Sequence, residues 1–100
     1  MIDHTSRIAV VVNGNAKSVT DEVISTLHQI LKGSDLFVSR DLEEAEEIAE
    51  TLVERQYGTV LTGGGDGTFT VMVTLVVRRA RSLGQALPRF GLLKLGTGNA

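Results

Sequence analysis

The chain has 100 residues, enough for one small domain, and its lack of cysteine excludes a disulfide framework, a thiolate metal site and a cysteine nucleophile. With 42% hydrophobic and 22% charged residues, the composition is that of a globular protein and excludes an intrinsically disordered chain. The net charge of −2 is unevenly divided, since residues 1–56 carry 5 basic and 11 acidic side chains and residues 57–100 carry 5 basic and 1 acidic.

Neither a secretory signal nor a membrane span is predicted. The first residues lack a basic segment followed by an apolar one, and no apolar run approaches the roughly 18 residues that a span requires. We therefore expect a cytoplasmic protein that is not transmembrane. Aromatic residues make up only 4% of the chain and no recognition motif occurs, so nucleic-acid binding is not expected.

The start of the chain predicts a buried strand followed by a helix. Residues 8–12 form a β-branched run that meets a turn at residues 13–15. Ser18 is expected to begin the helix, with Asp21 three residues later as its capping partner. Apolar residues then recur at helical spacing, and Gly33 supplies the stop.

The next segment repeats this pattern. Leu36–Ser39 is predicted to be a second short strand. Asp41 and Glu44 form a capping pair that opens a second helix, whose apolar face comprises Leu42, Ala45, Ile48, Ala49, Leu52 and Val53. Most of the acidic excess lies on the other face of this helix, which we interpret as a solvated surface.

A third strand, Thr59–Thr62, runs into a glycine-rich stretch at residues 63–67. Residues 68–81 are ambiguous, because their valines and threonines favour a strand while their apolar spacing fits a helix. The segment has no turn signal and is too long for a typical strand, so a helix is predicted. After a loop marked by Gly84 and Pro88, Phe90–Leu95 is the predicted fourth strand.

This alternation of strands and helices predicts an α/β fold with a parallel sheet covered on both faces, a three-layer βαβαβαβ sandwich. In such folds ligands bind beyond the carboxyl ends of the strands, near the point where the strand order reverses. If the strand order is 2-1-3-4, the glycine-containing loops after the first, third and fourth strands lie side by side. The sequence therefore predicts a ligand site at that edge.

The loop Gly63-Gly64-Gly65-Asp66-Gly67-Thr68 is the strongest candidate for phosphate binding. Its glycines allow the backbone to approach an anion closely, and the following helix adds its positive amino end. It is not a Walker loop, since the Lys-Ser/Thr pair is absent. Asp66 either organises Mg²⁺ beside the phosphates or caps the helix. Three preceding glycines, which a cap would not require, favour the functional interpretation.

A second glycine-rich turn, Gly96-Thr97-Gly98-Asn99, follows the fourth strand. Taken together, Leu61–Thr68 and Leu95–Asn99, one helix apart, resemble the catalytic domain of the diacylglycerol kinase family, which includes bacterial lipid kinases and sphingosine and ceramide kinases. The resemblance covers essentially the whole chain, because the order and spacing of all three loops agree. It implies an ATP- and Mg²⁺-dependent kinase that phosphorylates a lipid hydroxyl at a membrane surface.

The resemblance implies a role for each residue of the chain that matches a position in the family's motifs. Asp66 is implied to be catalytic and to organise Mg²⁺ through water. The residues that match the family's nucleotide contacts are Asn13, Ser39, Gly64, Gly65, Gly67, Thr68, Gly96, Thr97 and Asn99.

The resemblance also implies that residues 1–100 correspond to the first, ATP-binding part of the catalytic domain. In the family a β-rich second domain follows, which carries the acceptor pocket and the general base, so we expect the 100 residues alone to be inactive. The acceptor lipid and the oligomeric state cannot be deduced from these residues.

Departures from the family pattern leave other functions open. The first loop, Asn13–Lys17, lacks the family's proline and terminal glycine, and Lys94 replaces a proline. Val71 occupies the position of a usual glutamate, which removes an acidic group near the site. The alternatives are a non-catalytic nucleotide-binding module and an NAD kinase-like enzyme. The basic cluster Arg78, Arg79 and Arg81 either complements the helix dipole or attracts an anionic membrane.

Overall fold

The computed structural model describes residues 7–31 and 35–94, in which strands and helices alternate. The elements in chain order are β1 (Ile8–Asn13), α1 (Asp21–Leu31), β2 (Leu36–Ser39), α2 (Leu42–Glu54), β3 (Thr59–Gly63), α3 (Asp66–Ser82) and β4 (Arg89–Leu93). This is the predicted βαβαβαβ order. The last predicted strand, Phe90–Leu95, extends beyond the described residues at its carboxyl end.

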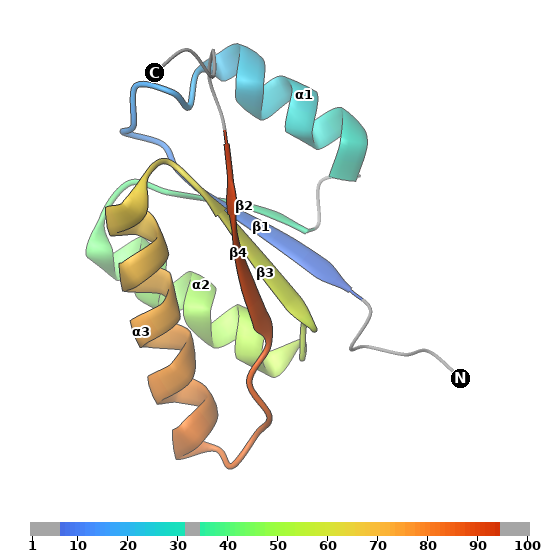
Figure 1. Cartoon of the computed structure of the whole chain (residues 1–100), viewed down its shortest axis with the longest axis vertical. Helices are drawn as coiled ribbons and strands as arrows, with labels where there is room; N and C mark the ends of the chain where they lie inside the picture. Colours follow the sequence, from blue (N-terminus) through green and yellow to red (C-terminus); the bar gives the residue numbers. More distant parts are fainter. Residues whose placement is uncertain (1–6, 32–34, 95–100) are drawn as a thin grey trace.

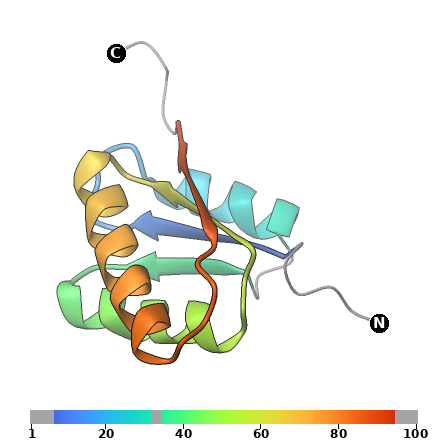
Figure 2. The same cartoon turned by 60° about the horizontal axis from the view of Figure 1, so that its bottom comes forward.

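The four described strands form one parallel sheet in the order β2-β1-β3-β4, as predicted. Helices α2 and α3 lie together on one face of this sheet, and α1 lies on the other (Figures 1 and 2). The domain is therefore a three-layer α/β sandwich. Because β1 is bordered by β2 and β3, the loop after β1 lies between the loops that follow its two neighbours.

The core is divided between the two faces by the alternation of side chains along each strand. In β1, Ala9 and Val11 pack among residues of α2 and α3, whereas Val10 and Val12 pack toward α1. All four are buried, as expected for a strand covered on both sides. By the same alternation, Asn13 continues the α2–α3 face at the end of β1.

The ambiguous segment after the glycine-rich loop is a helix, which confirms the prediction from its length. Met72, Val76 and Ala80 are buried against the sheet at intervals of four residues, so the helical periodicity determines its packing. The helix begins at Asp66, two residues before the predicted start. No helix of the described ranges is both long and apolar enough to cross a lipid bilayer.

The first helix begins later than predicted. It starts at Asp21, and the Thr20 hydroxyl accepts a hydrogen bond from the Val23 amide at 3.2 Å, so Ser18 neither begins nor caps it. The reason is that the preceding residues form tight turns, in which the Val19 amide donates to the Ala16 carbonyl. These turns place Val19 in the core before the helix can begin.

The capping pair of α2 is present as predicted. The Asp41 carboxylate accepts a hydrogen bond from the Glu44 amide at 2.8 Å. In return, the Glu44 carboxylate accepts one from the backbone amide of Arg40 at 2.7 Å. The first bond satisfies a donor that the first turn of a helix otherwise leaves without a partner, and both bonds fix the backbone where β2 passes into α2.

A polar cluster holds the amino ends of the strands together. The Asp35 carboxylate accepts hydrogen bonds from the Tyr57 hydroxyl at 2.6 Å and from the Arg7 guanidinium at 2.8 Å. Burial by itself raises the pKa of Asp35, but these two bonds outweigh it and hold the pKa below its ordinary value. Burial and the bond to Asp35 raise the pKa of the Tyr57 hydroxyl, which therefore remains a donor.

We predict that Tyr57→Phe lowers the free energy of unfolding by about 1–2 kcal/mol at neutral pH, because it removes a bond to an ionised acceptor. Since the folded pKa of Asp35 lies below its unfolded value, the stability from its ionised form is complete above the unfolded pKa. That stability is lost as the pH falls through the folded pKa. The difference between wild type and variant should therefore shrink in acid. Urea unfolding across this pH range measures it, and a difference independent of pH would contradict the assignment.

Candidate functional site

Three loops meet at the carboxyl edge of the sheet, and two glycines allow them to do so. A Cβ atom on Gly64 would lie 2.9 Å from the Asn13 Cβ, so the loop after β3 contacts the loop after β1 directly. On the other side of the β1 loop, a Cβ atom on Gly14 would lie 3.1 Å from the Arg40 Cγ. The loops after β2, β1 and β3 are therefore packed against one another.

A cleft of about 360 Å³ opens between these loops and the amino ends of α2 and α3. Its lining residues are Asn13, Asn15, Ser39, Arg40, Asp41, Leu42, Ala45, Gly64, Gly67, Thr68, Val71 and Met72. This volume is within the range of small-molecule sites. A larger cavity of about 630 Å³ lies elsewhere, bordered by Tyr57 and the loop before β4, and contains none of the predicted site residues.

The cleft brings together five of the predicted site residues: Asn13, Ser39, Gly64, Gly67 and Thr68. Two others, Gly65 and Asp66, begin α3 beside the cleft but do not line it. The remaining three, Gly96, Thr97 and Asn99, lie outside the described residues. Half of the predicted set therefore lines one cleft, and two further members lie next to it.

The β3–α3 loop has the backbone conformation that its glycines predict. Gly64 and Gly65 have φ angles of 124° and 108°, which L-residues rarely adopt. Gly65 is the N-cap of α3 and has no side chain to satisfy the first turn. The first bond of the helix runs from the Phe69 amide to the Gly65 carbonyl, so the amides of the three preceding residues remain available to a ligand.

Asp66 does not cap α3, since it is the first residue within the helix and Gly65 holds the N-cap position. Its carboxylate is exposed and makes neither a hydrogen bond nor an ion pair with the residues that the structure describes. The capping interpretation is thus not realised. A carboxylate at this position is favoured by the helix dipole, which stabilises negative charge in the first turn.

Thr68 is the most unusual polar group in the cleft. Its hydroxyl is buried and has no hydrogen-bond partner, although it lines the cleft one turn into α3. Thr62, at the end of β3, has a second buried hydroxyl without a partner. Buried hydroxyls are normally satisfied, so an unpaired hydroxyl beside an uncapped helix end is an observation that a ligand would explain.

Several lining residues were not predicted from the sequence. Asn15, Arg40, Asp41 and Leu42 follow β1 or β2. Val71, which the departure from the family pattern had placed near the site, lies one turn after Thr68 on α3. Val71 is 39% exposed and presents an apolar group to the cleft. Their position in the sequence could have identified those that follow a predicted strand, because residues immediately after a strand of a parallel sheet lie at the edge where ligands bind.

Within residues 7–31 and 35–94, no three histidine, aspartate or glutamate side chains gather into a site for a metal ion. Of the acidic groups at this edge, Asp41 is engaged in capping α2 and Asp66 is not engaged.

The fold and the cleft define a parallel α/β domain with a glycine-rich ligand edge. The sequence profile of the diacylglycerol kinase catalytic domain matches residues 7–100. The chain therefore belongs to the diacylglycerol kinase catalytic domain family, as the motifs indicated, and the family points to kinase activity. A comparison with curated proteins finds no match.

Alanine substitutions at Gly64 and Gly65 distinguish the loss of stability caused by backbone strain from the loss caused by a steric clash. Both positions have positive φ, so each substitution should cost about 1–3 kcal/mol of stability. Only at Gly64 does the new Cβ meet another atom, the Asn13 Cβ, whereas Gly65 faces open space. We predict that Gly64→Ala lowers the unfolding free energy by at least about 1 kcal/mol more than Gly65→Ala. Chemical denaturation measures both, and equal losses would contradict the loop contact.

Proposed function

We propose that the chain forms the ATP-binding part of an ATP- and Mg²⁺-dependent lipid kinase, which transfers the γ-phosphoryl group to a hydroxyl of diacylglycerol or a related lipid. The observation that carries this proposal is the uncapped amino end of α3, which lies beside the unpaired Thr68 hydroxyl in the cleft. Membership of a kinase family supports the phosphates of a nucleotide as the anion that this helix end would bind.

The phosphates would be bound chiefly by the start of α3. The amides of Gly67 and Thr68 and the Thr68 hydroxyl are donors that have no protein acceptor in the described ranges. Amides at a helix start act with the helix dipole to stabilise negative charge. Preorganised donors of this kind stabilise the charge that develops during phosphoryl transfer without having to reorganise.

Asp66 is the residue that would hold Mg²⁺, through water, next to the phosphates. Its exposed carboxylate is free of competing bonds to described residues, which fits a group that recruits a hydrated cation. When bound, Mg²⁺ neutralises phosphate charge and orients the nucleotide. Without a cation, a carboxylate at this position would repel the same phosphates.

In the proposed reaction, the lipid hydroxyl oxygen forms a bond to the γ-phosphorus as the bond to the β–γ bridging oxygen breaks, leaving ADP. The hydroxyl proton passes to a general base. Asp41 is the one carboxylate that lines the cleft among the described residues, and its bond to the Glu44 amide commits it to capping α2. The base and the acceptor pocket would therefore come from outside this cleft, as in the β-rich second domain of the family.

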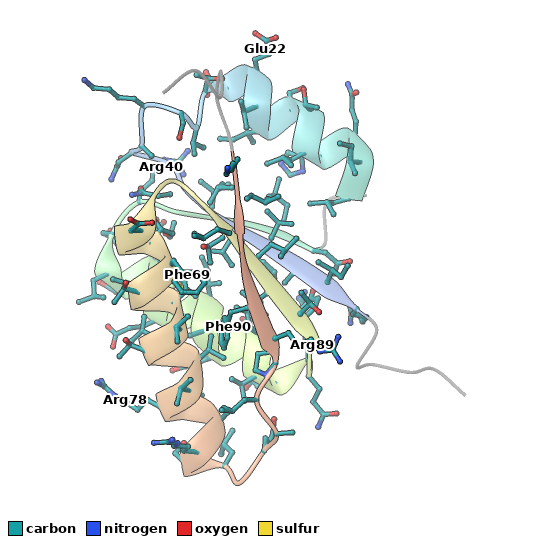
Figure 3. The ribbon with its side chains drawn as sticks, viewed as in Figure 1. Glu22, Arg40, Phe69, Arg78, Arg89 and Phe90 are labelled. Carbon is teal, nitrogen blue, oxygen red and sulfur yellow. The ribbon has the colours of Figure 1, made fainter. Side chains whose placement is uncertain are left out.

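The lipid acceptor implies work at a membrane surface, and we propose a cytoplasmic protein that binds that surface peripherally. Arg78 and Arg81 are exposed near the end of α3, and Arg78 and Arg89 lie far from Arg40 at the cleft (Figure 3). Because the two regions are well separated, these arginines do not contribute to nucleotide binding in this proposal.

Val71 favours a second candidate, a nucleotide-binding module without catalytic activity. It lines the cleft one turn beyond Thr68, where the family usually has a glutamate, and it offers no charge or hydrogen bond. A protein that binds ATP but phosphorylates neither diacylglycerol nor a sphingoid base would have this second function.

Replacing Thr68 by valine should change stability and ATP binding in opposite directions. Removal of an unpaired buried hydroxyl should raise the unfolding free energy by about 1 kcal/mol, whereas loss of a phosphate donor should weaken ATP binding about five- to tenfold. Thr70→Val is the matched control, because Thr70 is exposed on α3 outside the cleft. Calorimetric titration and thermal unfolding give the two values. Unchanged ATP affinity in Thr68→Val would contradict the role of the hydroxyl.

Asp66→Asn tests the metal role in the complete kinase. The carboxylate makes no bond with described residues, so the variant should retain its fold, with a loss of at most about 1 kcal/mol from the helix dipole. Lipid phosphorylation should nevertheless be abolished, and the Mg²⁺ dependence of ATP binding should disappear. Radiolabelled phosphate transfer and titrations with and without Mg²⁺ measure these effects. Normal turnover by a folded variant would refute the assignment.

A further inference from the structure

We propose that the larger cavity, at the amino edge of the sheet, binds a free fatty acid, with its hydrocarbon chain among buried aliphatic side chains and its carboxylate at Arg79. The cavity has a volume of about 630 Å³, within the range of small-molecule sites. Figure 1 shows the loop between α3 and β4, which borders the cavity, at the opposite end of the sheet from the β3–α3 turn. The cavity and the cleft share no lining residue, so the two sites are separate.

The walls of the cavity are mainly aliphatic. Leu52 and Val53, near the end of α2, and Val76, on α3, line it and are buried in the core. Residues 86–88, an alanine, a leucine and a proline before β4, form the outer wall. Tyr57 is the one aromatic residue among the described lining residues. Branched aliphatic surfaces of this kind fit a flexible hydrocarbon chain, whose methylene groups gain free energy by leaving water.

The loop that forms the outer wall is held by hydrogen bonds at its two ends. The Gln85 amide donates to the Ala80 carbonyl at 2.9 Å, and the Arg89 amide donates to the Gly58 carbonyl at 2.9 Å. Between these two bonds, Leu87 is 50% exposed although it borders an apolar cavity. A hydrocarbon chain in the cavity would give this leucine an apolar surface to pack against.

Gln56 adds a polar group to the lining at a position where its backbone is strained. It follows α2 with a φ angle of 58°, and its amide donates to the Val53 carbonyl. Glycine is the usual residue at such a helix end, and another residue there costs stability. The glutamine side chain lines the cavity, where its carboxamide is a hydrogen-bond donor for the head group of a ligand.

Arg79 supplies the positive charge for the carboxylate. It lies just outside the lining, three residues after Val76, so the two side chains are neighbours on the surface of α3. Its Nε is buried without a hydrogen-bond partner, and the side chain forms no ion pair within residues 7–31 and 35–94. Buried donors are normally satisfied, and a ligand carboxylate would satisfy this one with a charge-assisted bond.

The charges around the cavity favour an anionic head group over a cationic one. No acidic residue occurs in residues 67–94, whereas four arginines do. On the α2 side, Glu54 is exposed and does not line the cavity. The lining therefore has no carboxylate to oppose an anion, and the surrounding arginines attract one.

The experiment titrates the whole protein by calorimetry with dodecanoate and with dodecanol and dodecylammonium, which have the same chain but a neutral or a cationic head group. All three are kept below the concentrations at which they form micelles. Arg79→Gln removes the positive charge, and Ala86→Trp places a large side chain at an exposed position of the lining. Arg78→Gln is the matched control, because Arg78 is exposed and lies two residues after Val76, on another side of α3. Thermal unfolding verifies that each variant is folded.

We expect wild type to bind dodecanoate at least tenfold more tightly than dodecanol, and dodecylammonium more weakly still. From octanoate to dodecanoate, the affinity should rise about threefold to fourfold with each methylene group. Arg79→Gln should weaken dodecanoate binding about tenfold and leave dodecanol binding unchanged. Ala86→Trp should weaken the binding of both at least tenfold, whereas Arg78→Gln should bind both as wild type does.

Equal affinities of wild type for dodecanoate and dodecylammonium would overturn the proposal, because no charged group would then recognise the carboxylate. Dodecanoate binding that is unchanged in both Arg79→Gln and Ala86→Trp would overturn it as well, since the chain would lie elsewhere. Vesicles of phosphatidylglycerol provide a further comparison. If they competed with dodecanoate for the protein, the site would be a surface for anionic membranes and not a cavity for a single free chain.

Discussion

The contact between Gly64 and Asn13 is the constraint on which the geometry of the cleft depends. A Cβ at Gly64 would lie 2.9 Å from the Asn13 Cβ, so only glycine lets the loop after β3 close against the loop after β1. That closure directs the chain into α3, and thereby places Gly67 and Thr68 at the cleft. Parallel pairing of β1 with β3 up to Gly63 fixes where this contact occurs. A larger residue at position 64 would separate the two loops and displace the start of α3.

Most of the fold could be predicted because it depends on periodicity and on strand–helix alternation. Residues that alternate between two buried faces in β1 specify a doubly covered strand, and the spacing of Met72 and Val76 specifies which face of α3 packs. The start of α1 was not predictable in the same way. Ser18 and Thr20 are chemically equivalent as caps, and the choice between them is made by burial of Val19, which is a tertiary contact.

Without the family resemblance, which also implied Asn13, Ser39 and Thr68, the candidate site was most predictable where its chemistry is carried by glycine. Gly64 and Gly65 are required by their φ angles, and this requirement is visible in the sequence. Arg40 and Leu42 are not marked by any such requirement. In the sequence they lie in a capping segment before a helix, and their place in the cleft arises from the strand order, which sets β2 beside β1. A residue that acts through its position in the sheet leaves no local pattern.

Helices α2 and α3 both begin at the cleft, and their first turns differ in how the backbone amides are satisfied. At α2, the Asp41 carboxylate accepts a hydrogen bond from the Glu44 amide, and the Glu44 carboxylate accepts one from the Arg40 amide that precedes the helix. At α3, the N-cap is Gly65, and the amides of the first turn remain open beside the unpaired Thr68 hydroxyl. The free amides and the Thr68 hydroxyl favour an anion at α3, whereas the Asp66 carboxylate in the same turn favours a cation beside it. In the proposed function, the start of α3 would therefore bind the phosphates and the metal ion together, each offsetting the charge of the other.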